Sequence, residues 1–220
     1  MPVETYSISD LPRREVLRYL GYRGQELTPE VESRIDEGIE CMLKFARPSA
    51  SWSIFNLSDP SMWDDGAIHL DGCALVLTGH SIAKHLDGAV SCAVMAVTVG
   101  MAVERELKRL SSLDPVAGVI FDAAGTVAVE EAAAACQRSI IAEAESRGLY
   151  ANARFSPGYG DLPLSVQPVL LSTVDAQRRL GITLTDSLLM VPTKSVTALM
   201  GIFPDSPRAR RAERASGSLD

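Results

Sequence analysis

The chain has 220 residues, of which 46% are hydrophobic, and its formal net charge at pH 7 is −7. This length and apolar content suit one sizeable domain, or one domain with a helical appendage. The negative charge argues against a nucleic-acid-binding surface, which needs a basic patch, and no apolar run reaches the roughly 18 residues of a membrane helix. We therefore expect neither nucleic acid nor a membrane as a partner.

Residues 1–48 are predicted to form a helical segment packed on the main body. The first ten residues lack the basic start and apolar centre of a signal peptide, so we expect a cytoplasmic location. Residues 12–20 are predicted to form a helix that ends at Gly21. Thr28 is the expected N-cap of a second helix, which runs to about residue 45 with apolar residues at helical spacing.

The main body, residues 49–203, alternates between strand and helix patterns. Strands are expected at 51–57, 68–77, 92–99, 151–155, 182–184 and 195–202. Helices are expected at 81–86, 101–110, 115–147 and 166–180. Gly118 and Gly125 interrupt the longest helix, and close packing against another backbone is the expected compensation. From residue 204 onward the chain has few apolar groups, which is typical of a disordered tail.

The cysteines and histidines are not spaced as metal ligands. Cysteine occurs at Cys41, Cys73, Cys92 and Cys136, with no Cys-x-x-Cys pair. We expect buried free thiols, without a zinc site or a redox dithiol. Histidine occurs at His69, His80 and His85, where capping or surface roles are expected.

The longest predicted helix carries a carboxylate in an unusual place. Apolar residues of this helix fall on one stripe, and Glu130 lies in the middle of that stripe. A carboxylate on an apolar face is costly without a partner. Two interpretations remain open: a structural ion pair with a nearby arginine or lysine, or a site for the ammonium group of a ligand.

The segment from Arg154 to Asp161 combines a fixed cation, a proline, two glycines and an aromatic residue. Gly158 and Gly160 can adopt backbone angles that other residues avoid. The guanidinium of Arg154 can bind a carboxylate through two parallel hydrogen bonds, and Tyr159 offers a ring face and a hydroxyl. An ordinary turn rich in glycine and proline explains the segment equally well.

The order of the motifs after this loop favours a ligand-binding loop over an ordinary turn. Gln167 follows, then a Leu-Thr-acid-Ser element within residues 181–192, and then the Ser-Val strand of residues 194–198. This order resembles the activation domain of cobalamin-dependent methionine synthase, and the chain looks like the short, free-standing members of that family. Their N-terminal helix resembles residues 15–22, and their middle resembles residues 79–86 and 95–100. The likeness runs from about Glu15 to Gly201.

The resemblance implies an α+β domain with a mixed or mainly antiparallel sheet flanked by helices. It also implies S-adenosyl-L-methionine as the bound cofactor. Arg154, Gly158 and Tyr159 match the family's ligand-binding loop, and Ser156 matches a position whose backbone contacts the nucleoside. Glu130 is placed by the helix pattern at the family's glutamate, where it would bind the ammonium group. No residue is expected to act as a general acid or base.

The resemblance also implies a partner. The chain lacks the Asp-x-His-x-x-Gly signature of corrinoid binding, so cobalamin would be carried by a cobalamin-dependent methionine synthase that lacks its own activation domain. A flavodoxin-like protein is the candidate electron donor. The leading hypothesis is a factor that supports reductive remethylation of cob(II)alamin in trans. Alternatives are an activator of another corrinoid methyltransferase, a non-catalytic sensor of S-adenosylmethionine, or a structural subunit whose pocket has decayed.

Overall fold

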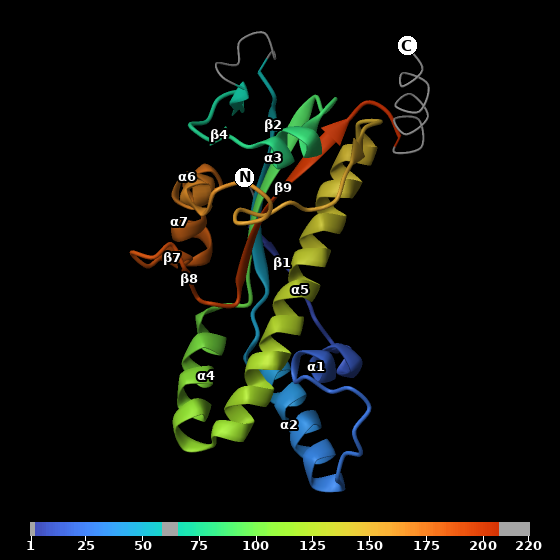
Figure 1. Cartoon of the computed structure of the whole chain (residues 1–220), viewed down its shortest axis with the longest axis vertical. Coiled ribbons are helices and arrows are strands. Elements are labelled where there is room, and N and C mark those ends of the chain that lie inside the picture. Colours follow the sequence, from blue (N-terminus) through green and yellow to red (C-terminus); the bar gives the residue numbers. More distant parts are fainter. Residues whose placement is uncertain (1–2, 59–65, 207–220) are drawn as a thin grey trace.

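The computed structural model describes residues 3–58 and 66–206 and has an α+β architecture (Figure 1). The helices are α1 (Arg13–Tyr19), α2 (Pro29–Phe45), α3 (His80–Leu86), α4 (Met101–Leu113), α5 (Pro115–Ser146), α6 (Gln167–Thr173) and α7 (Ala176–Leu180). The strands are β1 (Val3–Thr5), β2 (Ser49–Asn56), β3 (Ile68–His69), β4 (Val76–Leu77), β5 (Ser91–Thr98), β6 (Tyr150–Ala151), β7 (Thr183–Leu184), β8 (Met190–Val191) and β9 (Ser195–Phe203). The predicted fold class is confirmed, and the main sheet is antiparallel throughout.

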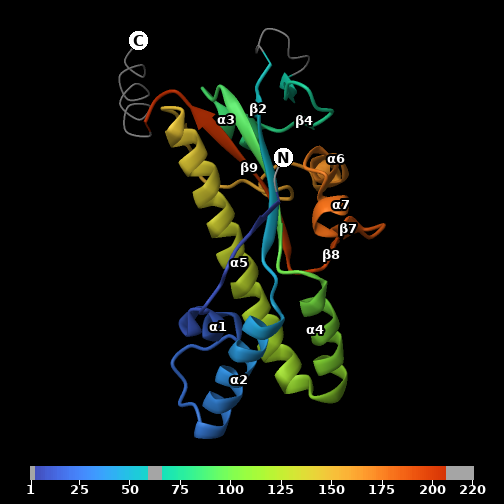
Figure 2. The same ribbon diagram turned by 180° about the vertical axis from the view of Figure 1, so that it is seen from behind.

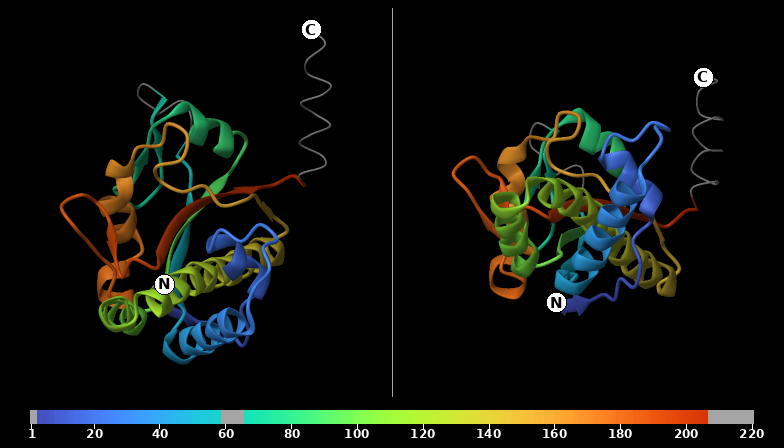
Figure 3. Two further views of the ribbon diagram at one scale, coloured as in Figure 1. Left: turned by 60° about the horizontal axis from the view of Figure 1, so that its bottom comes forward. Right: turned by 90° about the horizontal axis from the view of Figure 1, so that it is seen from below.

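The main sheet has five strands in the order β1-β2-β5-β9-β6, and β5 at its centre is buried along its whole length. Alternate residues of β5 enter different cores because side chains along a strand point to opposite faces. Met95 lies in a first core, between the sheet and helices α1, α2 and α5. Val94 lies in a second core, between the other face of the sheet and helices α3, α6 and α7. Figures 2 and 3 show these helices on either side of the strands.

Helix α5 is the longest element and contacts both the sheet and the other helices of the first core. Its N-cap is Asp114, whose carboxylate accepts hydrogen bonds from the N–H groups of Val116 and Ala117 at 3.1 Å each. The expected packing of a glycine against another backbone is confirmed at Gly118 but not at Gly125, which faces the side chains of Met42 and Lys194. A Cβ on Gly118 would lie 3.0 Å from the Cα of Ser111 in α4, so a larger residue here would push the two helices apart.

The predicted helix at 166–180 is wrong, because the chain breaks it into α6 and α7. Asp175 adopts a left-handed backbone conformation with φ of 52° between the two helices. The hydroxyl of Ser51 in β2 donates a hydrogen bond of 2.7 Å to the C=O of Val174. A side chain from a distant strand therefore satisfies a buried carbonyl at the break, which periodicity along the helix cannot reveal.

Further segments differ from the sequence prediction. The strand expected at 151–155 is reduced to β6, Tyr150–Ala151, and an isolated bridge at Phe155. The strand expected at 68–77 is a small hairpin, in which Ile68 pairs with Leu77 across β3 and β4. The N-terminal segment is not only helical, since β1 joins the edge of the main sheet next to β2. Its helices α1 and α2 pack on α5 through buried residues such as Val16 and Ile39. Most of the predicted tail, 207–220, lies outside the described residues.

All four cysteines are free thiols, as predicted, although only Cys92 and Cys136 are buried and the other two are half-buried. Within residues 3–58 and 66–206, no group of His, Cys, Asp and Glu side chains could hold a metal ion. None of the helices in this same part of the chain is long and apolar enough to cross a membrane.

Thiol labelling tests the placement of the two cores. Burial raises the pKa of Cys92 and of Cys136 to about 12, and the thiolate is the reactive form. Burial also raises the pKa of Cys41, although this thiol is only half-buried. We therefore expect a thiol reagent at pH 8 to modify Cys73 fastest and Cys41 more slowly in the native protein, and all four cysteines after unfolding. Peptide mass spectrometry identifies the sites, and fast native labelling of Cys92 or Cys136 would contradict this packing.

The variant Ser51→Ala tests the break between α6 and α7. It leaves the buried carbonyl of Val174 without its partner, so we expect the free energy of unfolding in urea to fall by about 1–3 kcal/mol. Ser53→Ala, on the same strand but half-buried, controls for the loss of a serine from β2 and should have a smaller effect. Equal losses in the two variants would show that the hydrogen bond is unimportant.

Candidate functional site

The predicted ligand loop is held at the edge of the main sheet. After β6, the chain runs beside β9, and Phe155 forms a bridge with Leu199 through hydrogen bonds of 2.9 and 2.8 Å. Neighbouring residues of an extended segment point to opposite sides. Phe155 accordingly packs against the second core, whereas Arg154 reaches α5 on the other side.

Beyond Phe155 the chain forms a tight loop that is closed by its own backbone. The N–H of Gly158 donates to the C=O of Leu162 at 2.9 Å, and the N–H of Tyr159 donates to the C=O of Ser156 at 3.2 Å. Gly158 and Gly160 have φ values of 88° and 56°, which only glycine adopts easily. This loop presents Tyr159 with 69% of its surface exposed.

The guanidinium of Arg154 meets the carboxylate of Glu130 in α5. The Nη2–Oε2 distance is 3.1 Å, and the side chains are 24% and 48% exposed, respectively. The expected apolar stripe through Glu130 faces the core only in part, because Ala123 and Val127 are buried, whereas Val116, at the start of the stripe, is 53% exposed. Glu130 itself is half exposed, so it does not lie on a core-facing ridge. Helix α5 is covered on several sides, so one apolar stripe does not identify its core face.

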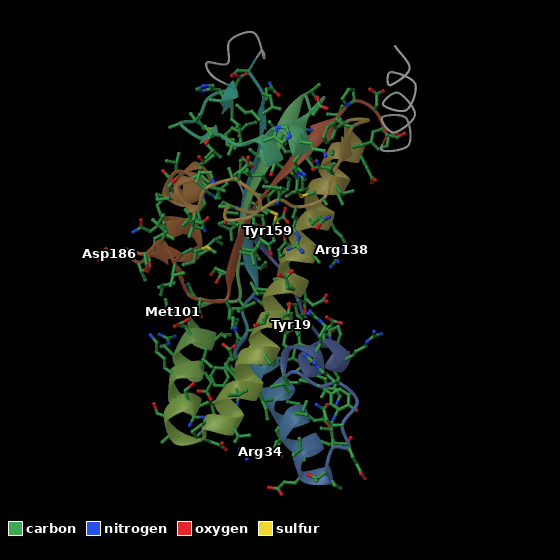
Figure 4. All side chains as sticks on the ribbon, viewed as in Figure 1. Tyr19, Arg34, Met101, Arg138, Tyr159 and Asp186 are labelled. Atoms are coloured by element: carbon green, nitrogen blue, oxygen red, sulfur yellow. The ribbon has the colours of Figure 1, made fainter. Side chains whose placement is uncertain are left out.

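These groups border a hollow of about 360 Å³ between α5, β9 and the loop. Four residues that were predicted from the sequence line it: Glu130, Arg154, Ser156 and Tyr159. Gly158 does not line the hollow, although its backbone shapes the loop beside it. In Figure 4, Tyr159 lies beside the middle of α5, whereas Arg138 projects from the outer side of that helix.

Sequence reasoning missed four further residues of the lining, namely Gln137, Ala153, Phe155 and Val196. Gln137 could have been found, because it lies seven residues after Glu130 and therefore on the same face of α5. Val196 comes from β9, and its place in the hollow follows only from the packing of α5 on the sheet.

The hollow has the chemistry to bind a zwitterion. It offers one cation and one anion side by side, and Ser156 and Tyr159 are among the other residues that line it. A small molecule that carries both a carboxylate and an ammonium group could replace the contact between Arg154 and Glu130 with a contact to each.

Comparison with solved structures supports the same fold. Among thirteen matching chains is the "Crystal Structure of the MetH Reactivation Domain bound to AdoHcy", with a TM-score of 0.63 and 16% sequence identity. The match covers 94% of this chain and 80% of that chain. At this identity, the likeness shows the fold alone. None of the curated proteins matches the chain.

The family comparison matches residues 85–208, which contain α5, the loop and every residue that lines the hollow. The matched family is described as "Vitamin B12 dependent methionine synthase, activation domain". The match spans more than half of the 220 residues. The chain therefore belongs to the family of vitamin B12 dependent methionine synthase activation domains.

Proposed function

We propose that this protein binds S-adenosylmethionine in the hollow beside Arg154 and supports the reductive remethylation of cobalamin on a partner methionine synthase. The observation that supports the proposal is the ion pair between Glu130 and Arg154, both of which line the hollow. The MetH reactivation domain, which shares the fold, was solved with AdoHcy bound. AdoHcy is the product that remains when S-adenosylmethionine gives up its methyl group.

The amino-acid end of the ligand lies between the two charged side chains in this proposal. Arg154 binds the α-carboxylate through parallel hydrogen bonds, and Glu130 accepts hydrogen bonds from the α-ammonium group. The two side chains must separate to admit the ligand. That separation costs little, because Glu130 is half exposed and ion pairs near the surface contribute only about 0–1 kcal/mol.

The nucleoside end lies against the loop. The N–H of Gly158 is engaged by Leu162, so its carbonyl is the group offered to the adenine. The C=O of Ser156 accepts one hydrogen bond from Tyr159 and has a second lone pair for the ligand. The exposed ring of Tyr159 lies over the sulfonium, where a π face favours a positive charge.

This chain contributes binding and orientation to the transfer. Cobalamin, carried by the partner, supplies the acceptor of the methyl group, and a flavodoxin-like protein supplies the electron. Glu130 and Arg154 hold the amino-acid end, so that the methyl group faces the partner in one orientation. Holding two reactants in a fixed geometry lowers the entropic part of the barrier, without a general acid or base from this chain.

Removing either charge should weaken ligand binding. Hydrogen bonds to charged groups contribute about 1.5–3 kcal/mol each, so we expect Arg154→Ala and Glu130→Gln to weaken S-adenosylmethionine binding by roughly 10- to 100-fold. Isothermal titration calorimetry measures the change. Arg147→Ala is the matched control, since Arg147 pairs with Glu143 near the end of the same helix.

A charge-swapped variant separates ligand binding from a structural ion pair. The double variant Glu130→Arg with Arg154→Glu keeps opposite charges in contact, so its stability should stay close to that of the native protein. Its affinity for S-adenosylmethionine should stay well below that of the native protein, because each end of the zwitterion then meets a like charge. Unchanged affinity in both single variants would rule out the proposed contacts.

A remethylation assay tests the action on a partner. The assay mixes this protein, a methionine synthase truncated before its activation domain, a one-electron reductant and S-adenosylmethionine labelled in its methyl group. We expect label on cobalamin only when this protein is present, and strongly reduced transfer with Arg154→Ala. Tight ligand binding without transfer would contradict reactivation and favour the alternative of a sensor.

A further inference from the structure

The short helix α3 contacts both ends of the loop segment that borders the hollow. Asn152 precedes the segment and touches the C-terminal end of α3, and Asp161 ends the segment and touches the N-terminal end. We propose that α3 is a brace that sets the position of Arg154 and Tyr159, with Asn152 and Asp161 as positioning residues. The effect on ligand affinity rests on the proposed function, whereas the brace itself does not.

The contact between Asp161 and the N-terminal end of α3 combines charged hydrogen bonds with close packing. The carboxylate of Asp161 accepts hydrogen bonds from the N–H groups of His80 at 2.6 Å and Ser81 at 2.8 Å. These N–H groups, that of Ser81 foremost, hold the pKa of Asp161 below its usual range. The carboxylate is therefore charged at neutral pH, where it bonds most strongly to the free N–H groups of a helix start.

Two glycines allow this approach. A Cβ on Gly160 would lie 2.5 Å from the Oγ of Ser81, and a Cβ on Gly79 would lie 2.9 Å from the Oδ1 of Asp161. Both glycines also have positive φ values. The loop and α3 thus meet at a contact that leaves no room for a side chain on either facing glycine.

The C-terminal contact ties α3 to the sheet as well. The side-chain amide of Asn152 donates to the C=O of His85 at 2.8 Å, and its oxygen accepts from the N–H of Gly201 in β9 at 2.7 Å. Between the two ends, the ring of His85 packs on Phe155 with a centroid separation of 5.0 Å. The segment is therefore attached to α3 before, within and after its site residues.

Helix α3 is firmly anchored, whereas Tyr159, which it helps to position, is exposed. Ile82 and Leu86 bury α3 in the second core. Tyr159 is mostly exposed, so packing around its ring does little to orient it and the backbone of its loop must do so. Loosening that backbone should cost ligand affinity, because part of the binding energy would then be used to order the loop.

Ligand binding by Asp161→Ala tests the positioning role. We expect its affinity for S-adenosylmethionine, measured by calorimetry, to fall about tenfold, the cost of ordering one or two side chains and their loop. Asp161→Asn keeps one acceptor oxygen and should lie between the native protein and Asp161→Ala. Asp114→Ala is the matched control, because Asp114 caps α5 through the same kind of hydrogen bonds away from the loop.

Amide hydrogen exchange of the ligand-free protein tests the brace without the proposed function. We expect Asp161→Ala to speed exchange at residues 80–83 and 158–162, with β5 and the middle of α5 unchanged. If the native protein did not bind S-adenosylmethionine, the proposed function would be wrong. Hydrogen exchange would still test the brace, because it needs no ligand. Unchanged exchange in the loop, or native ligand affinity in Asp161→Ala, would overturn the positioning role.

Discussion

The position of the candidate site depends on one constraint: after the end of α5, the chain runs back along the edge of β9. The pairing of β6 with β9 and the bridge between Phe155 and Leu199 hold this return segment in register. Alternation along it sends Phe155 to one face of the sheet and Arg154 to the other. The contact with Glu130 therefore follows from the packing of a helix on a sheet rather than from a local motif.

Glu130 and Arg154 are placed so that each can give up its contact with the other and bind a ligand instead. A deeply buried pair would be costly to separate, since each ion would be left without solvent or a counter-charge. Glu130 and Arg154 instead lie at the surface of a hollow, with Glu130 half exposed. A zwitterionic ligand can take over both contacts, and the protein loses little stability when the side chains move apart.

The surroundings of this pair combine rigid and exposed parts. The strands and α3 are anchored in two cores, and the loop closes on itself through backbone hydrogen bonds. Tyr159 stands on this loop with most of its surface open. Because the backbone of this loop is already fixed, ligand binding has to order only the side chain of Tyr159, and such preorganisation raises affinity.

The sequence by itself determined the buried central strand, the long helix and the loop, because periodicity and glycine positions are local signals, and the family resemblance implied the fold class. It also named Glu130 and Arg154, partly through the family resemblance. Only the tertiary structure decided the break at Asp175 and the contacts of α3 with Asn152 and Asp161. Those features depend on hydrogen bonds between residues far apart in the chain, which local patterns do not record.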